Sequence, residues 1–439
     1  MGKSEIPTTN GMFPGKVCAG LGLMVCWILA APSFAQQPPS APSSAPLSAP
    51  SSASVSASAS QDDTNKILLQ RIRDLEAKMK LLEEKQVAAA PAAVTTEAPP
   101  PVVEAPRQNQ VAERLQLRVF GDVGYHVSDE KGDTNTFDIG SLDLFMTARL
   151  SHKVSLLGEV LMISTNTNDI SLDVERLVLQ YHPSEHFNFA VGRYHTAIGY
   201  YNTAFHQGQW FQTAIGRPFM YEFDDRGGPL PLQEVGVSAN GSIPSGKFGL
   251  HYIAEVGNGR SHLLGQNPAQ NSQDTNNGKS FNVGAFAQLA WVPGLQLGFS
   301  VYHDKLTFSD NINHGELIST VHVVYLNSTY EWLNEGMLVR HGNSATGVVA
   351  NTSAFYSQFS RRFGSYRPYF RYEYINASDN DPIYGDPADG PVVGRRNGPT
   401  AGLRWDFNEH AAAKLQYERQ STRGEKSSNG LATQFAFTF

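Results

Sequence analysis

Apolar and polar residues alternate along most of the chain from residue 115 onward. In the first alternating segment, every second residue is apolar or glycine: Leu115, Leu117, Val119, Gly121, Val123, Tyr125 and Val127. A period of two places the two sets of side chains on opposite faces of a β-strand. The same alternation recurs in residues 142–150, 370–374, 403–407 and 435–439. The pattern therefore predicts an all-β region over residues 115–439.

The predicted strands are joined by connections of two length classes. Seven short turns cover residues 151–153, 183–186, 242–247, 292–294, 327–328, 363–366 and 408–410. Eight longer polar stretches cover residues 128–136, 165–170, 196–230, 258–279, 307–316, 341–351, 377–397 and 421–428. Outer-membrane barrels have tight turns at the periplasmic end and longer loops outside. The sequence therefore predicts a transmembrane antiparallel β-barrel of about 16 strands in the cell outer membrane.

The longest connection, residues 196–230, is the third of the long loops and lies between the fifth and sixth predicted strands. It carries many aromatic residues for a loop surrounded by water: Tyr200, Tyr201, Phe205, Trp210, Phe211, Phe219 and Tyr221. A barrel of about 16 strands is too wide for its wall side chains to fill. We therefore expect this loop to fold into the lumen and narrow it.

The same loop carries a cluster of charged residues: Arg217, Glu222, Asp224, Asp225 and Arg226. Opposed charges across a constriction produce a transverse field that orients polar solutes, and an imbalance between them sets ion preference. We expect these residues to line the pore constriction. In the alternative interpretation, they form salt bridges within the loop.

Charged residues on the polar face of the strands are candidates for the pore wall. The basic candidates are Arg193, Arg371 and Arg404, and the acidic candidates are Glu159, Glu373, Asp406 and Glu418. Together they predict a charged lumen of mixed sign. For each residue taken singly, a solvated wall position without a role in selection is the alternative.

Residues 1–35 have the features of a secretory signal peptide. Lys3 and Lys16 provide positive charge, residues 17–31 are apolar, and residues 33–35 offer small side chains at the cleavage site. A retained anchor is the alternative, but the apolar stretch is shorter than the roughly 20 residues of a transmembrane helix.

A low-complexity region and a charged helix follow the signal peptide. Residues 36–61 consist largely of Ser, Ala, Pro and Gln, which predicts a disordered linker. In residues 62–87, apolar residues recur at heptad spacing and form a seam of Leu68, Ile72, Leu75, Met79 and Leu82. This spacing predicts a short coiled-coil helix that associates with copies of itself; a helix lying on the barrel mouth is the alternative. Residues 88–114 are expected to form a second, Ala/Pro-rich linker.

Charge, cysteine content and missing motifs narrow the function classes. The chain carries 34 basic and 41 acidic residues, a formal net charge of −7, which disfavours nucleic-acid binding. Cys18 and Cys26 both lie in the expected signal peptide, so the mature chain would have neither disulfides nor thiolate metal sites. Nucleophile-elbow, phosphate-loop and zinc-protease motifs are missing from the sequence. We therefore expect no catalytic residue, metal or cofactor; a Ser/His pair assembled across strands is the alternative.

The chain ends in alternating aromatic residues, Phe435, Phe437 and Phe439. A terminal strand that ends on an aromatic residue resembles the signal that outer-membrane barrels present to their assembly machinery. Phe439 is therefore the predicted assembly signal, and the barrel assembly machinery is an expected partner.

Residues 191–202 and 255–260 carry a resemblance to a known family. Together with the predicted coiled coil, they resemble the phosphate-selective porin superfamily in its broad sense. The resemblance implies a homotrimer of sixteen-stranded channels. Members that select phosphate use a ladder of pore-facing arginines and lysines, whereas the candidate arginines here alternate with carboxylates.

These expectations converge on a porin that allows small hydrophilic solutes to diffuse passively, with phosphate-like anions as the candidate class. Its partners would be outer-membrane lipid, copies of itself and small ionic solutes. The alternative is a structural protein that tethers the envelope through its periplasmic coiled coil. Deletion of residues 36–110 separates the two, because a porin would still conduct and a tether would lose envelope attachment.

Overall fold

The computed structural model describes residues 115–164, 169–205, 209–223, 228–261, 269–270, 272–307, 312–384 and 393–439. The expected signal peptide, coiled-coil helix and linkers, residues 1–114, lie outside this part of the chain. So do three residues of the predicted constriction, Asp224, Asp225 and Arg226.

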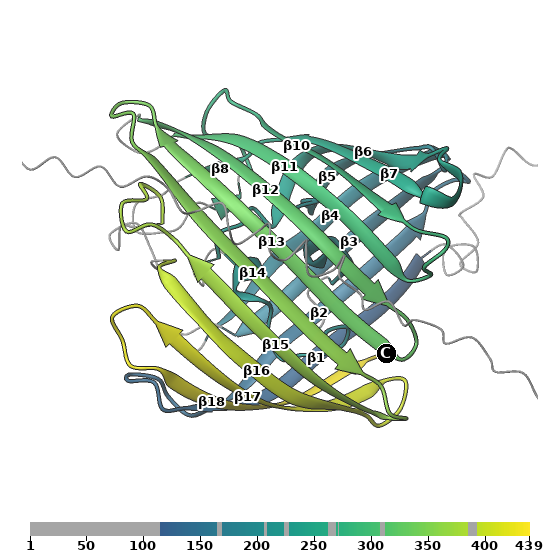
Figure 1. Cartoon of the computed structure of the whole chain (residues 1–439). Helices are drawn as coiled ribbons and strands as arrows, with labels where there is room; N and C mark the ends of the chain where they lie inside the picture. The colour runs from purple at the N-terminus through teal and green to yellow at the C-terminus, as the bar shows by residue number, and fades with distance from the viewer. Residues whose placement is uncertain are drawn as a thin grey trace, which may run out of the picture. The chain divides into compact units, whose positions relative to one another are not determined.

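Within the described residues, antiparallel strands close into a barrel in which each strand pairs with its neighbours in sequence and the first pairs with the last (Figure 1). The barrel strands are β1 (Leu115–Ser128), β2 (Thr136–Arg149), β3 (Val154–Ser164), β4 (Ile170–Ser184), β5 (Phe187–His195), β6 (Gln233–Ile243), β7 (Leu250–Gly257), β10 (Ser280–Gln288), β11 (Leu295–Thr307), β12 (Asn313–Leu326), β13 (Tyr330–Asn343), β14 (Val349–Arg361), β15 (Tyr366–Asn376), β16 (Arg395–Asp406), β17 (Ala411–Thr422) and β18 (Ser428–Thr438). The predicted antiparallel barrel of about 16 strands is confirmed.

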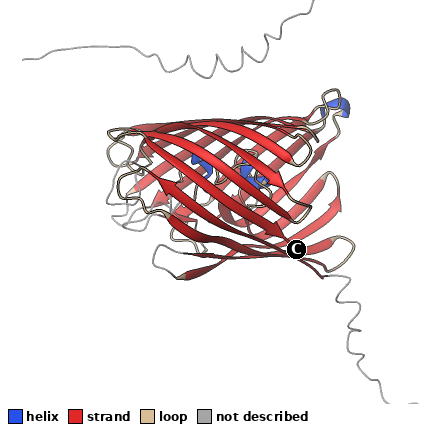
Figure 2. Cartoon of the chain, turned by 90° about the horizontal axis from the view of Figure 1, so that it is seen from below, coloured by secondary structure: helices blue, strands red, loops and turns tan. Residues whose placement is uncertain are grey.

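The remaining elements are short. Strands β8 (Arg260–Ser261) and β9 (Ala269–Gln270) form a separate two-stranded sheet. Helices α4 (Tyr201–Ala204) and η1 (Phe219–Tyr221) belong to the connection between β5 and β6, and in Figure 2 they lie within the ring of strands. A third short helix, η3 (Gly246–Phe248), lies in the turn between β6 and β7. In the part of the chain that the structure describes, no helix has the length and hydropathy that a membrane span requires.

The two ends of the barrel differ, as the connection lengths predict. The turns β2–β3, β4–β5 and β12–β13 are short, and the longer loops leave the opposite end. The first and last strands pair along their length, and at the short-turn end Val119 and Phe439 exchange backbone hydrogen bonds of 2.9 and 3.0 Å. The predicted assembly signal, Phe439, therefore closes the seam of the barrel, and its side chain is 73% exposed.

The outer face of the barrel is apolar on alternate residues. Phe281 and Val283 on β10, and Phe299 and Val301 on β11, are between 40% and 58% exposed. Exposed apolar side chains at every second position are typical of strands that face lipid.

An aromatic row lies on the same face near the short-turn end. The ring of Trp405 lies 5.9 Å from that of Tyr366 and 4.2 Å from that of Phe407, centroid to centroid. Aromatic girdles of this kind mark the level at which a barrel leaves the hydrocarbon region.

The inner face of β12–β15 is apolar where the β5–β6 connection packs against it. Ile318, Leu333 and Ile375 are fully buried on these strands and form one cluster with Ile198 and Leu230 of that connection. Removing each large apolar side chain from water stabilises this packing by about 1.5–3 kcal/mol at most. The inward positions of the strands are expected to face water. On β12–β15 they do not, because side chains of the β5–β6 connection cover them.

Candidate functional site

The third long loop, between β5 and β6, folds into the barrel as predicted. Its two ends are drawn together, since the side-chain amide of Asn202 donates to the carbonyl oxygens of Thr196 (2.8 Å) and Leu232 (2.7 Å). The backbone N–H of Thr196 also donates to Leu232 O at 3.0 Å. The residues between are therefore directed away from their own strands and across the lumen.

Glu335 on β13 holds the first part of this loop. Its carboxylate accepts hydrogen bonds from the backbone N–H groups of Tyr200 (2.5 Å) and Tyr201 (2.9 Å). It also accepts the hydroxyl groups of Tyr221 (2.7 Å), from the same loop, and Tyr356 (2.6 Å), from β14. Glu335 is 3% exposed, so these four donors replace the water that a buried carboxylate has lost. We call Glu335, Tyr200, Tyr201, Tyr221 and Tyr356 the glutamate clasp.

Basic side chains of β15–β17 hold the middle of the loop on the far wall. Lys414, Arg404 and Arg371 donate to backbone carbonyl oxygens of the loop at 2.5 to 3.3 Å. The accepting carbonyls belong to Gln209, Trp210, Gln212, Ala214 and Gly216. Hydrogen bonds from charged donors are the stronger kind in proteins. Three basic side chains of the wall therefore bind backbone carbonyl groups of the loop rather than its charged side chains.

The last part of the loop is fastened near the long-loop end. Arg260 donates to Pro229 O at 3.1 Å and forms a buried ion pair with Glu316. His341 lies between Glu316 (3.0 Å) and Asp381 (2.8 Å), which joins this pair to the β15–β16 connection. All of these charged side chains are buried together, so each is compensated by a partner.

The predicted wall residues differ in what they contact. Arg371 and Arg404 face the lumen, but the loop covers them, so they are only 3% and 8% exposed. Each also pairs with a predicted acidic wall residue, Arg371 with Glu373 at 2.6 Å and Arg404 with Asp406 at 2.7 Å. Arg193 on β5 instead bonds to Asp173 at 3.2 Å and to Gln233. Of the other acidic candidates, Glu159 is buried beside Arg176 and Glu418 is partly exposed.

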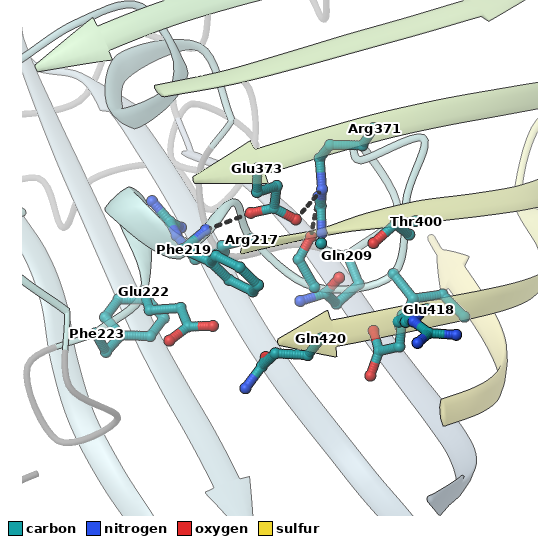
Figure 3. Close-up of a pocket in the computed structure, with 14 residues that line it drawn as sticks. Gln209, Arg217, Phe219, Glu222, Phe223, Arg371, Glu373, Thr400, Glu418 and Gln420 are labelled. Atoms are coloured by element: carbon teal, nitrogen blue, oxygen red, sulfur yellow. Dashed lines mark hydrogen bonds and ion pairs between the residues drawn. The ribbon is translucent and has the colours of Figure 1, made fainter. Parts of the chain in front are cut away.

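A cavity remains between the loop and β15–β17, on the long-loop side of the fastened segment (Figure 3). It encloses about 200 Å³. Its charged lining residues are Arg217, Glu222, Arg371, Glu373, Glu418 and Arg419. In Figure 3, Glu222 from the loop and Glu418 from β17 approach this space from opposite sides. We call it the charged cavity.

Of the predicted constriction residues, Arg217 and Glu222 line this cavity. Arg217 is 8% exposed; its guanidinium donates to Tyr221 O at 2.6 Å and to Asn202 Oδ1 at 3.2 Å. Burial lowers the pKa of Arg217. Its contacts lie within the loop, so it shapes the loop from inside. Glu222 is more open and pairs with Arg396 of β16 at 2.8 Å.

Sequence reasoning missed the clasp and Lys414. Glu335 occupies an inward position of β13, which alternation alone could assign to the lumen. Glu331, four residues earlier on the same face of the strand, has the same signal, but it accepts a hydrogen bond from the Thr213 hydroxyl of the loop at 3.0 Å instead. Periodicity identifies the face of a strand but not which loop atom that face meets.

No protein-family model matches the chain, and no curated protein matches it in sequence. Solved structures do share its fold. An anion-selective porin from Comamonas acidovorans matches at a TM-score of 0.51 and 11% identity, over 74% of this chain and 100% of that one. OmpF of Salmonella typhi, in complex with daunomycin, matches at 0.51 and 12%, over 74% and 97%. OmpT of Vibrio cholerae, expressed in the outer membrane, matches at 0.50 and 10%, over 74% and 98%. The chain has a porin-like barrel.

Proposed function

We propose that this chain is an outer-membrane channel through which small hydrophilic solutes diffuse passively. The observation that carries the proposal is the third loop, which crosses the lumen and is fastened to β13 and to β15–β17. A loop fastened in this way narrows a wide barrel to a passage of fixed size. The apolar outer face, with its aromatic row, fits a barrel surrounded by lipid.

The charged cavity supports selection by size and electrostatics without chemistry. Its described lining carries three basic and three acidic residues, so both signs of charge face the solute. Fixed charges of both signs in a narrow space orient a dipolar solute and slow a bulky one. Small ionic solutes are the proposed cargo, and phosphate-like anions are the finer class that the sequence resemblance suggests.

The proposed assembly is a homotrimer with a periplasmic N-terminal region. The trimer is what the sequence resemblance implies, the heptad seam of residues 62–87 supports self-association, and the start of β1 at the short-turn end of the barrel supports the periplasmic position. The same end would be presented to the assembly machinery through Phe439. The tether function concerns residues 36–110, outside the described part of the chain, and would be revealed by loss of envelope attachment when they are deleted.

Planar-bilayer recording tests the channel function. Purified, folded protein should produce stepwise increases in current in potassium chloride, and protein unfolded by heat should produce none. A salt gradient then gives the sign of selectivity from the reversal potential. Absence of stepwise current from folded protein would refute the channel.

A further inference from the structure

A second cavity lies on the other side of the third loop, toward the short-turn end. The third loop covers it with Ala197, Gly199 and Thr203. The barrel wall contributes residues of β6, β7, β10, β11 and β12. This cavity shares no described lining residue with the charged cavity, so a solute would meet it separately.

Two neighbouring rows of side chains form its wall. In the first row, strand pairing places His251 beside Phe286, Phe286 beside Gly298, and Gly298 beside His322. The rings of His251 and Phe286 are stacked, with centroids 4.6 Å apart and planes at 10°. Gly298 is needed between the rings, because a Cβ there would lie 2.4 Å from His322 Cε1 and 2.7 Å from Phe286 Cβ. This row is therefore a strip of rings: those of His251 and Phe286 stack face to face, and the imidazole of His322 lies over Gly298.

The second row lies two residues farther along each strand and carries smaller side chains. Strand pairing joins Asn240 to Ile253, Ile253 to Gly284, and Gly284 to Ser300. Ser300 Oγ accepts the backbone N–H of Gly199 at 3.4 Å, so this row faces the lumen and lies against the third loop. Small residues between a strip of rings and a loop leave a hollow, which we call the ring-lined niche.

The niche is uncharged in its chemistry. Of the described residues that line it, none is a lysine, arginine, aspartate or glutamate. Its polar side chains are the amides of Asn240 and Gln296, the imidazoles of His251 and His322, and the hydroxyl groups of Thr203, Tyr252 and Ser300. The Nε2 atom of His322 lies 3.2 Å from the side-chain nitrogen of Gln296, and among the described residues its Nδ1 has no partner. An ionic solute would lose hydration here without gaining a counter-charge.

We propose that the ring-lined niche is a subsite for uncharged polyhydroxylated ring compounds, that is, neutral sugars of monosaccharide size. The strip of rings supplies apolar surface for the C–H groups of such a ring, and the amides, imidazoles and hydroxyl groups of the lining supply donors and acceptors for its own hydroxyl groups. A concave, largely apolar site with a few convergent polar groups is the usual form of a small-molecule site. The proposal rests on the channel function and assigns a solute class to one side of the constriction.

Saturation-transfer NMR on the folded full-length chain in detergent micelles tests the proposal without requiring ion conduction. Glucose should bind, and glucuronate, which adds a carboxylate to the same ring, should bind at least about tenfold more weakly. Phe286→Ala should weaken glucose binding about five- to tenfold through loss of apolar ring surface. Phe281→Ala removes the same ring from the outer face of the same strand, so it should bind glucose like the wild type.

A second variant guards against misfolding of Phe286→Ala. Asn240→Leu keeps all rings in the wall, fills part of the hollow and removes an amide, so it should also weaken glucose binding. Equal binding by the wild type and both niche variants would overturn the proposal. So would glucuronate binding as tightly as glucose, or adenosine binding more tightly than glucose. Salt conductance is recorded on the same samples. Current without glucose binding would refute the sugar subsite and leave the channel function standing. Glucose binding without current would refute the channel function.

Discussion

Glu335 accepts four hydrogen bonds where the third loop meets β13. Two of the donors are backbone N–H groups at the start of α4, which have no acceptor within a helix turn. The other two are tyrosine hydroxyls that come from different elements. A single buried side chain thus satisfies the backbone of the loop and joins it to two strands.

Replacement of Glu335 should release the first part of the loop. Glu335→Ala leaves three donors without their acceptor, at about 1–3 kcal/mol for each that finds no water, whereas the Tyr221 hydroxyl still reaches Ile198 O at 3.3 Å. Amide hydrogen exchange at Tyr200 and Tyr201 should then accelerate by at least about tenfold. Glu335→Gln keeps one acceptor oxygen and should give an intermediate rate. Glu409→Ala, in an exposed turn, is the control, and the idea fails if Glu335→Ala exchanges no faster than this control.

The clasp should also weaken at alkaline pH. Burial, with the nearby Glu335 carboxylate, raises the pKa of Tyr200 to about 12, whereas a free tyrosine titrates near 10. A detached loop can ionise this hydroxyl at a pH where the attached loop cannot. Attachment is therefore fully present below about pH 10 and weakens as the pH rises toward 12. In Tyr200→Phe, amide hydrogen exchange in the loop should increase less at alkaline pH than it does in the wild type. An increase equal to that of the wild type would show that ionisation of Tyr200 does not weaken the attachment.

At the scale of elements, the loop and the far wall depend on each other. Lys414 and Arg404 have predominantly loop carbonyls as partners, and without the loop they would face open lumen. The apolar inner positions of β13, such as Leu333 and Val339, also require the loop to cover them. The wall and the loop are therefore one packed unit rather than a tube and an insert.

Removal of the wall cations should loosen the middle of the loop. Lys414→Met and Arg404→Ala each remove two hydrogen bonds to loop carbonyls, worth about 1.5–3 kcal/mol apiece for a charged donor, and Arg404→Ala also removes the ion pair with Asp406. Limited proteolysis should then cut between residues 205 and 217 several times faster than in the wild type. The matched control is Arg361→Ala, which removes an exposed arginine of β14 that lies over Phe363. Cleavage at the control rate would show that these cations do not hold the loop.

Alternation along the chain was sufficient to predict the strands and the place of the loop. The first predicted segment begins at Leu115, as β1 does, and the predicted loop at residues 196–230 fills the connection between β5 and β6. On β13 the alternation is blurred, because Leu333 and Val339 face the loop while Trp332 and Leu338 face outward. The fastening contacts join residues more than a hundred positions apart, such as Tyr201 and Glu335, and a local pattern carries no information on such pairs.

At the scale of the whole molecule, the third loop contributes to two cavities of different chemistry. The charged cavity faces the long loops, and the ring-lined niche faces the short turns. A solute from the long-loop end would thus meet charged groups on one side of the loop, and one from the short-turn end would meet uncharged groups on the other. The outer surface of the same barrel is apolar and carries its aromatic row near the chain end. The outer face of the barrel wall is therefore apolar, whereas its inner face is charged beside one cavity and uncharged beside the other.

The central claim is that the fastened third loop sets the width of the passage. Single-channel conductance tests it most directly, in wild-type protein and in a variant in which residues 209–223 are replaced by a short Gly-Ser linker. Circular dichroism first verifies that the barrel of the variant is folded. The account predicts a conductance several times larger in the same salt, because the segment that crosses to β15–β17 is gone. A conductance equal to or below that of the wild type would contradict it.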